Sequence, residues 1–394
     1  MTETPFKISI PDEKLLLLRK KLELATLPDE LDDSGWDYGA PLADVRRLIE
    51  RWTNGYDWRK YEAELNAELP QFTRDIEIDG YGTLNIHYLH KRSDVEQAIP
   101  LLFVHGWPGN FLEARKLLPL LTKGGDTFPA FHMVAVGLPG YGFSEAPKTK
   151  GFNPEKYAEV GHKLMLALGY QEYVTQGGDW GFPITLRIAK LYGGEHSKAW
   201  HINMSTGEPP NADTESPLTE REKEGLERTA WFRRVGTGYL IQQSTQPQTL
   251  GYSLADSPVG LLAWIYEKLV TWSDAYPWSD DEVLTWISIY WFSRAGPTAS
   301  LRIYREEPMA TAFSGIDPSP TIPLGISQFP KDILVLPKSW TRALGNVVFD
   351  ADHERGGHFA AYEKPEDLAG DLRKMFGRGG PAFGVVSGKD GYAA

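Results

Sequence analysis

One short stretch constrains the fold of this chain more than any other. The β-prone pair Tyr173 and Val174 leads into Gly177-Gly-Asp-Trp-Gly181, and an apolar segment with helical spacing follows over residues 184–192. A strand, a sharp turn and a helix, with small residues around a central polar one, form a nucleophile elbow, in which a strained turn lifts one side chain above a parallel sheet. Glycine suits the flanking positions because a Cβ there would collide with the neighbouring strand and helix.

The central residue of this turn, Asp179, determines the chemistry expected of it. The usual residue at this position is Ser, which needs a base to remove its proton. A carboxylate is already ionised at neutral pH, so it attacks directly, and it suits displacement at an alkyl carbon better than acyl transfer. An ordinary Gly-rich turn with a solvated Asp has the same pattern, so the interpretation depends on the rest of the chain.

Composition limits the partners and the compartment. Of the 394 residues, 41% are hydrophobic and 28 are prolines, which is typical of a compact globular protein with many loops. A net charge of −12 argues against nucleic acid or an anionic membrane as a partner. The absence of cysteine excludes disulfides, thiol catalysis and Cys-ligated zinc. We find no signal-peptide pattern and no apolar run near the roughly 20 residues that cross a bilayer, so we expect a cytoplasmic protein.

The first half of the chain changes pattern near residue 96. Residues 1–95 predict three helices, starting near Ser9, Val45 and Trp58, and then a hairpin over residues 72–90. Residues 96–206 alternate short apolar strands (101–104, 133–136 and 199–203) with helices (112–121 and 154–168). Such alternation predicts an α/β fold with a mainly parallel sheet that is flanked by helices.

The second half interrupts this alternation and then resumes it. Residues 207–320 are rich in helical patterns, aromatic residues and Pro or Gly breaks, which predicts an inserted helical cap. In residues 321–394 we expect strands at 333–336 and 347–349, a helix at 365–376, and a Gly-rich tail that is mobile.

Two loops supply further candidate residues. His358 lies between Gly356-Gly and Phe359-Ala-Ala, after the last predicted strand, where this fold places a catalytic His. The sequence His105-Gly-Trp-Pro108 follows a strand, and the backbone amides of Trp107 and Trp180 together suit an oxyanion hole. The Trp107–Pro108 peptide bond is a candidate for the cis form.

A phenol is a third useful group in such a site. It donates a hydrogen bond to an ether oxygen, keeps its proton at neutral pH, and passes that proton to a stronger base. The chain has 18 tyrosines, so composition alone does not select the functional ones.

Taken together, these motifs make the chain resemble the epoxide hydrolases of the α/β-hydrolase fold, of the microsomal type in the soluble form found in fungi and bacteria. The resemblance covers nearly the whole chain. It rests on N-terminal motifs and on core motifs, namely Ser9-Ile-Pro-Asp-Glu-Lys-Leu15, Leu27-Pro-Asp-Glu-Leu31, Tyr56-Asp-Trp-Arg-Lys60, Pro70-Gln-Phe-Thr73, Ile86-His-Tyr-Leu-His90, His105-Gly-Trp-Pro-Gly109, Pro139-Gly-Tyr-Gly-Phe-Ser144, Gly177-Gly-Asp-Trp-Gly181 and Gly356-Gly-His-Phe-Ala-Ala361. It implies an N-terminal meander (1–95), a core in two parts (96–206 and 321–394) and a cap (207–320).

The resemblance assigns roles to individual residues. It implies that Asp179 is the nucleophile, that His358 is the base, and that Asp332, which follows Phe329-Pro before the penultimate strand, is the charge-relay acid. Asp350 and Asp352 remain alternatives for the acid because they are nearer to His358 in the sequence.

The resemblance also selects two tyrosines in the cap, Tyr239 and Tyr304. Tyr252 is the alternative to Tyr239.

The activity that follows from the resemblance is the conversion of an epoxide into a vicinal diol. Asp179 would form a covalent alkyl ester, and water activated by His358 and Asp332 would hydrolyse it. Tyr239 and Tyr304 would bind the epoxide oxygen beside Trp107 and Trp180. An epoxide and water are the expected partners, no metal or organic cofactor is expected, and the resemblance also allows a homodimer.

Two other functions share parts of this pattern. A haloalkane or haloacid dehalogenase has the same fold with an Asp followed by Trp, but a halide needs other donors than two phenols. A non-catalytic binding protein predicts a broken triad, and here each expected position is filled. The cap contains eight aromatic residues that suit a pocket for an aryl epoxide: Trp231, Phe232, Trp264, Trp272, Trp278, Trp286, Trp291 and Phe292. We expect at least half of them to form the core of the cap instead.

Overall fold

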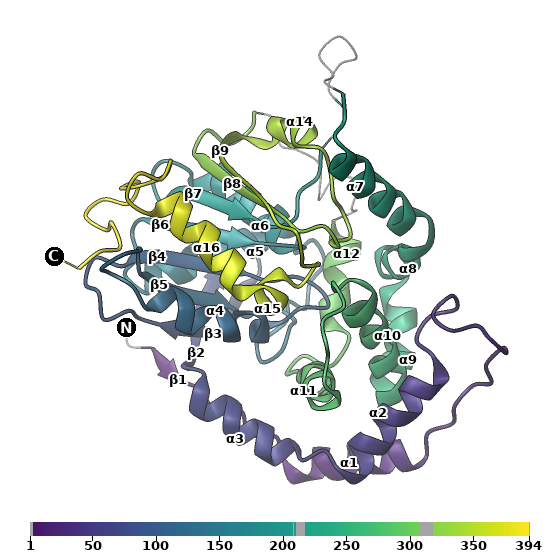
Figure 1. The fold of residues 1–394 in the computed structure, drawn as a ribbon. Helices are drawn as coiled ribbons and strands as arrows, with labels where there is room; N and C mark the ends of the chain where they lie inside the picture. Colours follow the sequence, from purple (N-terminus) through teal and green to yellow (C-terminus); the bar gives the residue numbers. More distant parts are fainter. Residues whose placement is uncertain (1–2, 208, 210–216, 308–317, 394) are drawn as a thin grey trace.

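A computed structural model describes residues 3–207, 209, 217–307 and 318–393, and its centre is a nine-stranded sheet (Figure 1). The strand order is β1-β2-β3-β5-β4-β6-β7-β8-β9. The strands β1 to β3 and the β3–β5 pair are antiparallel, and all the other neighbours are parallel. The strands are β1 (Thr4–Pro5), β2 (Gln71–Ile78), β3 (Gly82–Lys91), β4 (Ile99–Val104), β5 (Phe131–Val136), β6 (Tyr173–Gly177), β7 (Ser197–Ile202), β8 (Pro323–Gln328) and β9 (Asn346–Asp352).

Helices cover both faces of this sheet, which confirms the predicted α/β fold class. The helices α4 (Ala114–Thr122) and α16 (Pro365–Phe376) lie together on one face, and α5 (Pro154–Ala167) and α6 (Gly181–Tyr192) lie on the other (Figure 1). Every residue of β4 and β5 is buried, as expected for strands covered on both sides.

The helical insertion, defined here as α7 to α12, lies between β7 and β8. It consists of α7 (Glu220–Trp231), α8 (Gly238–Thr245), α9 (Pro247–Asp256), α10 (Pro258–Thr271), α11 (Asp280–Trp291) and α12 (Arg302–Glu306). Short π and 3-10 segments, Phe232–Gly236 and Ala299–Leu301, connect some of them. Among the described residues, no helix is long and apolar enough to span a bilayer. The domain boundaries at residues 95, 206 and 320 stay a prediction.

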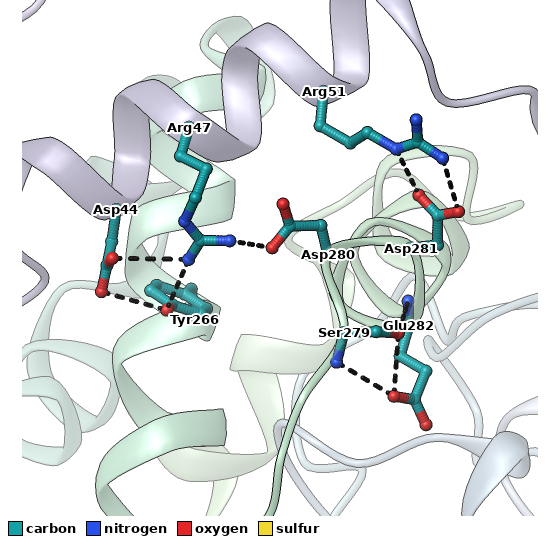
Figure 2. A network of polar contacts seen from close by, with 8 residues as sticks. All are labelled: Asp44, Arg47, Arg51, Tyr266, Ser279, Asp280, Asp281 and Glu282. Carbon is teal, nitrogen blue, oxygen red and sulfur yellow. Dashed lines mark hydrogen bonds and ion pairs between the residues drawn. The ribbon is translucent and has the colours of Figure 1, made fainter.

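The N-terminal helices α1 (Asp12–Glu23), α2 (Leu42–Asn54) and α3 (Trp58–Glu68) run from the sheet to the helical insertion (Figure 1). Polar contacts join α2 to α11 there (Figure 2). The guanidinium of Arg51 donates to both oxygens of Asp281 at 2.8 Å, and Arg47 pairs with Asp280. At the start of α11, Ser279 and Glu282 form a capping box.

The prediction of a strand at residues 333–336 is wrong. The sheet takes the preceding segment Pro323–Gln328 as β8, although Pro and Gly weaken its β propensity. Gly325 is required there because a Cβ would lie 2.5 Å from the sulfur of Met375. The predicted segment packs on α7 instead, where the Thr229 hydroxyl donates to the carbonyl of Val335 at 3.1 Å and accepts from its amide at 2.9 Å.

The expectation that the Gly-rich tail is mobile is also wrong for the residues described. The tail has no regular secondary structure beyond α16, but the amide of Gly391 donates to Gln97 O at 2.8 Å, and its carbonyl accepts from the Ala130 amide at 2.7 Å. The side chains of Val386 and Tyr392 are buried. These contacts tie the tail to the ends of β4 and β5.

The close approach of β6 to α6 gives a test of the elbow geometry. A Cβ on Gly177 would lie 2.5 Å from the carbonyl oxygen of Gly181, and both belong to backbone that cannot move freely. We expect Gly177→Ala to lower the free energy of unfolding by about 1–3 kcal/mol. The matched control is Gly370→Ala in α16, where a Cβ meets nothing within 4 Å. Urea unfolding should show equal or higher stability for this control, and equal destabilisation of both variants would contradict the argument.

Candidate active site

Asp179 lies in the turn between β6 and α6, at the carboxyl ends of the parallel strands. Its φ angle of 51° is in the left-handed region, which non-glycine residues rarely adopt. The turn holds this conformation because glycines at 177 and 181 let the strand and helix approach each other closely, and a Cβ on Gly181 would also collide with the carbonyl of Val104 in β4. The predicted nucleophile elbow is therefore present as a backbone geometry.

The two carboxylate oxygens of Asp179 have different environments. The amide of Trp107 donates to Oδ1 at 2.6 Å. Oδ2 lies 3.4 Å from Nε2 of His358. The side chain is buried, so both contacts act in a medium of low dielectric, where they are stronger than in water.

The second ring nitrogen of His358 identifies its acidic partner. Nδ1 lies 2.7 Å from Oδ1 of Asp332, whose residue is only 1% exposed. The amide of Ile333 donates to the same oxygen at 2.6 Å. The structure thus brings together Asp179, His358 and Asp332 in the order carboxylate, imidazole, carboxylate. Asp332 follows the penultimate strand, not precedes it as predicted, because that strand is β8.

The alternative acids make other contacts. Asp350 pairs with Arg342 at 3.3 Å, and Asp352 pairs with Lys338 at 2.9 Å. Both lie in β9, and neither is bonded to His358 in the contacts of the described chain. Geometry therefore favours Asp332 over both.

The ionisation of His358 depends on its two neighbours. Burial alone would lower the pKa of this imidazole, but the charges and hydrogen bonds of Asp332 and Asp179 outweigh it and raise the pKa to about 10. At neutral pH the site therefore holds an imidazolium between two carboxylates.

The oxyanion loop, defined here as residues 105–110, lies between β4 and the helix that starts at Phe111. Its Trp107–Pro108 peptide bond is cis, as the sequence indicated. The loop is buried, and its carbonyl groups have donors from the insertion: Trp286 Nε1 donates to Pro108 O at 2.7 Å, and the Tyr290 hydroxyl donates to Gly109 O at 2.6 Å. Trp180, the second predicted amide, follows Asp179 directly.

The two predicted tyrosines meet above Asp179. The ring of Tyr239, from α8, is stacked on Trp107 with centroids 5.2 Å apart. The ring of Tyr304, from α12, stands edge-on to Trp107 at 5.9 Å and to Trp180 at 4.9 Å. Burial raises the pKa of both phenols, and the charge of Asp179 contributes to each shift, so both keep their protons. Tyr252 is 71% exposed in α9, so geometry favours Tyr239 over this alternative.

A cavity of about 690 Å³ lies next to Tyr239 and Trp272. Its other walls come from residues 36–39 of the N-terminal segment and from Trp231, Trp264 and Lys268 of the insertion. Of the eight aromatic residues predicted for a pocket, three line this cavity: Trp231, Trp264 and Trp272. Others serve as core, since Trp286 and Phe292 are buried and Trp278 stacks on Tyr362.

Sequence reasoning missed several residues of this site. Lys268 is 4% exposed, and its ammonium lies 5.2 Å from the ring centroids of Tyr239 and of Trp264. Burial lowers its pKa to about 7. The signal was a Lys inside the apolar run Leu261-Leu-Ala-Trp-Ile-Tyr-Glu-Lys-Leu-Val270.

Glu113 was also missed, and Trp272, which was predicted only as one of the aromatic residues of the cap, contacts His358 directly. Burial and the charge of Asp179 raise the pKa of Glu113 to about 8, although the charge of His358 opposes this shift. Trp272 places its ring edge-on to His358, with centroids 5.0 Å apart, and its carbonyl accepts from the His358 amide at 2.8 Å. No sequence motif distinguishes these two residues from core residues.

His87 and His90 have structural partners. Nε2 of His87 lies 3.0 Å from Gln71 Oε1, and Nδ1 of His90 lies 2.7 Å from Glu3 Oε1. Within the described part of the chain, no group of three or more His, Asp or Glu side chains is arranged to hold a metal ion.

Comparison with known proteins identifies the family. Residues 3–114 match the family model of the epoxide hydrolase N terminus, and residues 99–231 match that of the alpha/beta hydrolase fold. Epoxide hydrolase 1 of Sus scrofa is 37% identical over 411 residues, which cover 95% of this chain and 88% of the relative. The chain belongs to the epoxide hydrolases.

Solved structures of epoxide hydrolases show the same fold. The Aspergillus niger epoxide hydrolase is 36% identical, with a TM-score of 0.83 over 94% of this chain and 95% of that one. The juvenile hormone epoxide hydrolase of the silkworm Bombyx mori is 28% identical, with a TM-score of 0.84 over 94% of this chain and 93% of that one. The α/β-hydrolase fold expected from the resemblance is thereby confirmed.

The raised pKa of His358 makes the stability of this epoxide hydrolase depend on pH. A group whose pKa is higher in the folded state stabilises fully below its unfolded pKa, about 6.5, and this stabilisation is lost as the pH rises through its folded pKa, about 10. We therefore expect the free energy of unfolding of the wild type, minus that of His358→Gln, to fall between pH 6.5 and pH 10.

Urea unfolding of both proteins at several pH values measures this difference, in which the titrating groups that do not interact with His358 cancel. A difference that stays constant or grows over the range would show that His358 is not a buried imidazolium.

Proposed function

We propose that this epoxide hydrolase converts its substrate into a vicinal diol in two steps, through a covalent ester on Asp179. The observation that carries the proposal is that the two carboxylate oxygens of Asp179 have different hydrogen-bonding partners. Oδ1 is occupied by the Trp107 amide, whereas Oδ2 faces His358 and has no backbone donor among the described contacts. One oxygen is thus suited to remain a carbonyl and the other to attack.

In the first step, the substrate lies between the elbow and the helical insertion. The hydroxyls of Tyr239 and Tyr304 donate to the epoxide oxygen, and Oδ2 of Asp179 attacks one ring carbon from the opposite side. The C–O bond breaks, its electron pair goes to the former ring oxygen, and a tyrosine supplies the proton. Both phenols are protonated and lie near Asp179, which supports this role.

The proton of His358 then converts the tyrosinate left by the first step back into a tyrosine. Esterification removes the negative charge of Asp179, one of the groups that raise the pKa of His358. The imidazolium then becomes a stronger acid and returns a proton, through water, to the tyrosinate. This transfer leaves His358 neutral, with Asp332 still bonded to Nδ1, so that the free Nε2 becomes a base when the second step needs one.

In the second step, His358 deprotonates a water molecule that attacks the carbonyl carbon of the ester. Negative charge collects on Oδ1, where the Trp107 amide donates, and the Trp180 amide adds a second donor. Collapse of this intermediate expels the diol alkoxide, which takes the proton from His358 and leaves Asp179 as a carboxylic acid. Asp179 then gives this proton to His358, which restores the carboxylate and the imidazolium. The cavity beside Tyr239 supplies the binding region for the rest of the substrate, and its aromatic walls suit an aryl group.

The test of this mechanism is a single turnover of styrene oxide by excess enzyme in ¹⁸O-labelled water. We expect unlabelled oxygen in the first diol and the label in the peptide that contains Asp179, because water attacks the ester carbonyl. We also expect His358→Gln to form the ester and to accumulate it, detectable as an added mass on the intact protein. The control is Asp179→Ala, which should form neither the ester nor the diol.

Other outcomes would exclude this mechanism. Label in the first diol and none in the peptide would mean that water attacks the epoxide directly. Normal turnover by His358→Gln would remove His358 as the base. Halide release from a haloalkane without diol formation would favour the dehalogenase, but the two phenols near Asp179 suit an alkoxide better than a halide.

The role of the phenols predicts a defect confined to the first step. Tyr304→Phe should slow ester formation roughly 10²-fold, because the developing alkoxide loses a donor. Quenched single turnovers measure this step directly. The matched control is Tyr252→Phe, which removes a hydroxyl from the exposed tyrosine of α9 and should change nothing. A Tyr304→Phe variant with normal ester formation and slow ester hydrolysis would contradict the assignment.

A further inference from the structure

Two side chains of α11 hold the oxyanion loop, and the proposed chemistry does not use either of them. Trp286 Nε1 donates to Pro108 O at 2.7 Å, and the Tyr290 hydroxyl donates to Gly109 O at 2.6 Å. The two residues are four apart in one helix, so they lie on the same helix face. Both side chains are buried.

The two carbonyls that they bind follow directly after Trp107, whose amide donates to Asp179. A buried carbonyl without a donor is costly, so the loop would rotate its peptide planes to find one. Such a rotation would move the Trp107 amide away from Oδ1. An unpaired carbonyl dipole beside the site of developing negative charge would also oppose that charge. The donors from α11 prevent both effects.

Tyr290 keeps its proton for this bond. Burial, followed by the charges of Glu113 and Asp179, raises the pKa of its phenol. The hydroxyl therefore remains a donor at neutral pH.

The N-terminal helices hold α11 from other positions along it. Asp281 accepts from Arg51, and Asp280 pairs with Arg47 (Figure 2). The Tyr61 hydroxyl also donates to Asp281. The Tyr56 hydroxyl lies 3.0 Å from Thr285 Oγ1. The helix thus connects the N-terminal segment to the oxyanion loop through side-chain contacts.

We propose that α11 positions the oxyanion loop for the second chemical step, with Tyr290 and Trp286 as its positioning residues. The inference rests on the proposed two-step function. The charge on Oδ1 falls when Asp179 becomes an ester and rises again when water attacks that ester. A weaker amide donor therefore slows ester hydrolysis and does not slow ester formation.

The test measures the two steps separately in Tyr290→Phe, which removes one oxygen and keeps the ring. We expect the rate constant of ester hydrolysis, followed by quenched single turnovers of styrene oxide, to fall roughly five- to tenfold, less than the roughly 10²- to 10³-fold cost of removing a donor itself. The rate constant of ester formation should stay within twofold of the wild type. In the steady state, kcat/KM should be unchanged, because it does not contain the hydrolysis step.

Two further variants make the result specific. Trp286→Phe removes the other donor and should produce the same selective slowing. Tyr56→Phe is the matched control, since it also removes a hydroxyl bonded to α11, but at a position that does not contact the loop, and Arg51, Tyr61 and Arg47 still hold the helix. Both rate constants of this control should equal those of the wild type.

An unchanged rate of ester hydrolysis in Tyr290→Phe and Trp286→Phe would overturn the inference, and so would an equal slowing of both steps, which indicates general loosening of the site. These outcomes are distinct from failure of the proposed function. In that case the wild-type enzyme itself would form no ester on Asp179.

Discussion

The arrangement of this site depends on a single imidazole that two buried carboxylates share. Nε2 of His358 lies 3.4 Å from Oδ2 of Asp179, and Nδ1 lies 2.7 Å from Oδ1 of Asp332. Both acidic residues raise the pKa of this buried imidazole, so His358 keeps its proton at neutral pH although burial opposes the charge. Backbone amides complete the stabilisation, from Trp107 to Asp179 and from Ile333 to Asp332. The fold delivers both amides because each lies in a loop that follows a parallel strand.

This electrostatic arrangement also explains how one residue can be an acid early and a base later. While Asp179 is charged, His358 holds its proton firmly. Once the proposed ester forms, Asp179 no longer raises the pKa of His358, and the imidazole releases its proton more easily. The nucleophile itself therefore controls the ionisation of the base, with no need for a conformational change between the two steps. A neutral Gln at position 358 cannot make this change, which is why the ester is expected to accumulate in that variant.

Much of this arrangement could be predicted from local sequence. The elbow and the His358 loop are recognisable because glycines are required at close backbone approaches, and the pattern of the early strands reflects burial on both faces. Strand β8 could not be predicted, because Pro323 and Gly325 lower the β propensity of its sequence. The more apolar residues 333–336 have the pattern of a strand, but they pack on α7. Lys268, Glu113 and the donors from α11 were missed because their significance arises from residues distant in the sequence, which no local pattern encodes.

The helical insertion raises a separate physical question, since no strand ladder joins it to the sheet in the part of the chain that the structure describes. Its tyrosines must nevertheless meet Asp179 within hydrogen-bonding distance of one small substrate. Exposed ion pairs such as Arg47–Asp280 each contribute little stability. Their role here is to orient α11, because a bidentate pair such as Arg51–Asp281 fixes the orientation of a helix as well as its distance from its neighbour. An N-terminal segment that reaches both the sheet and α11 therefore does the work of such a ladder from outside the site, while Tyr239 and Tyr304 pack directly on Trp107 of the oxyanion loop.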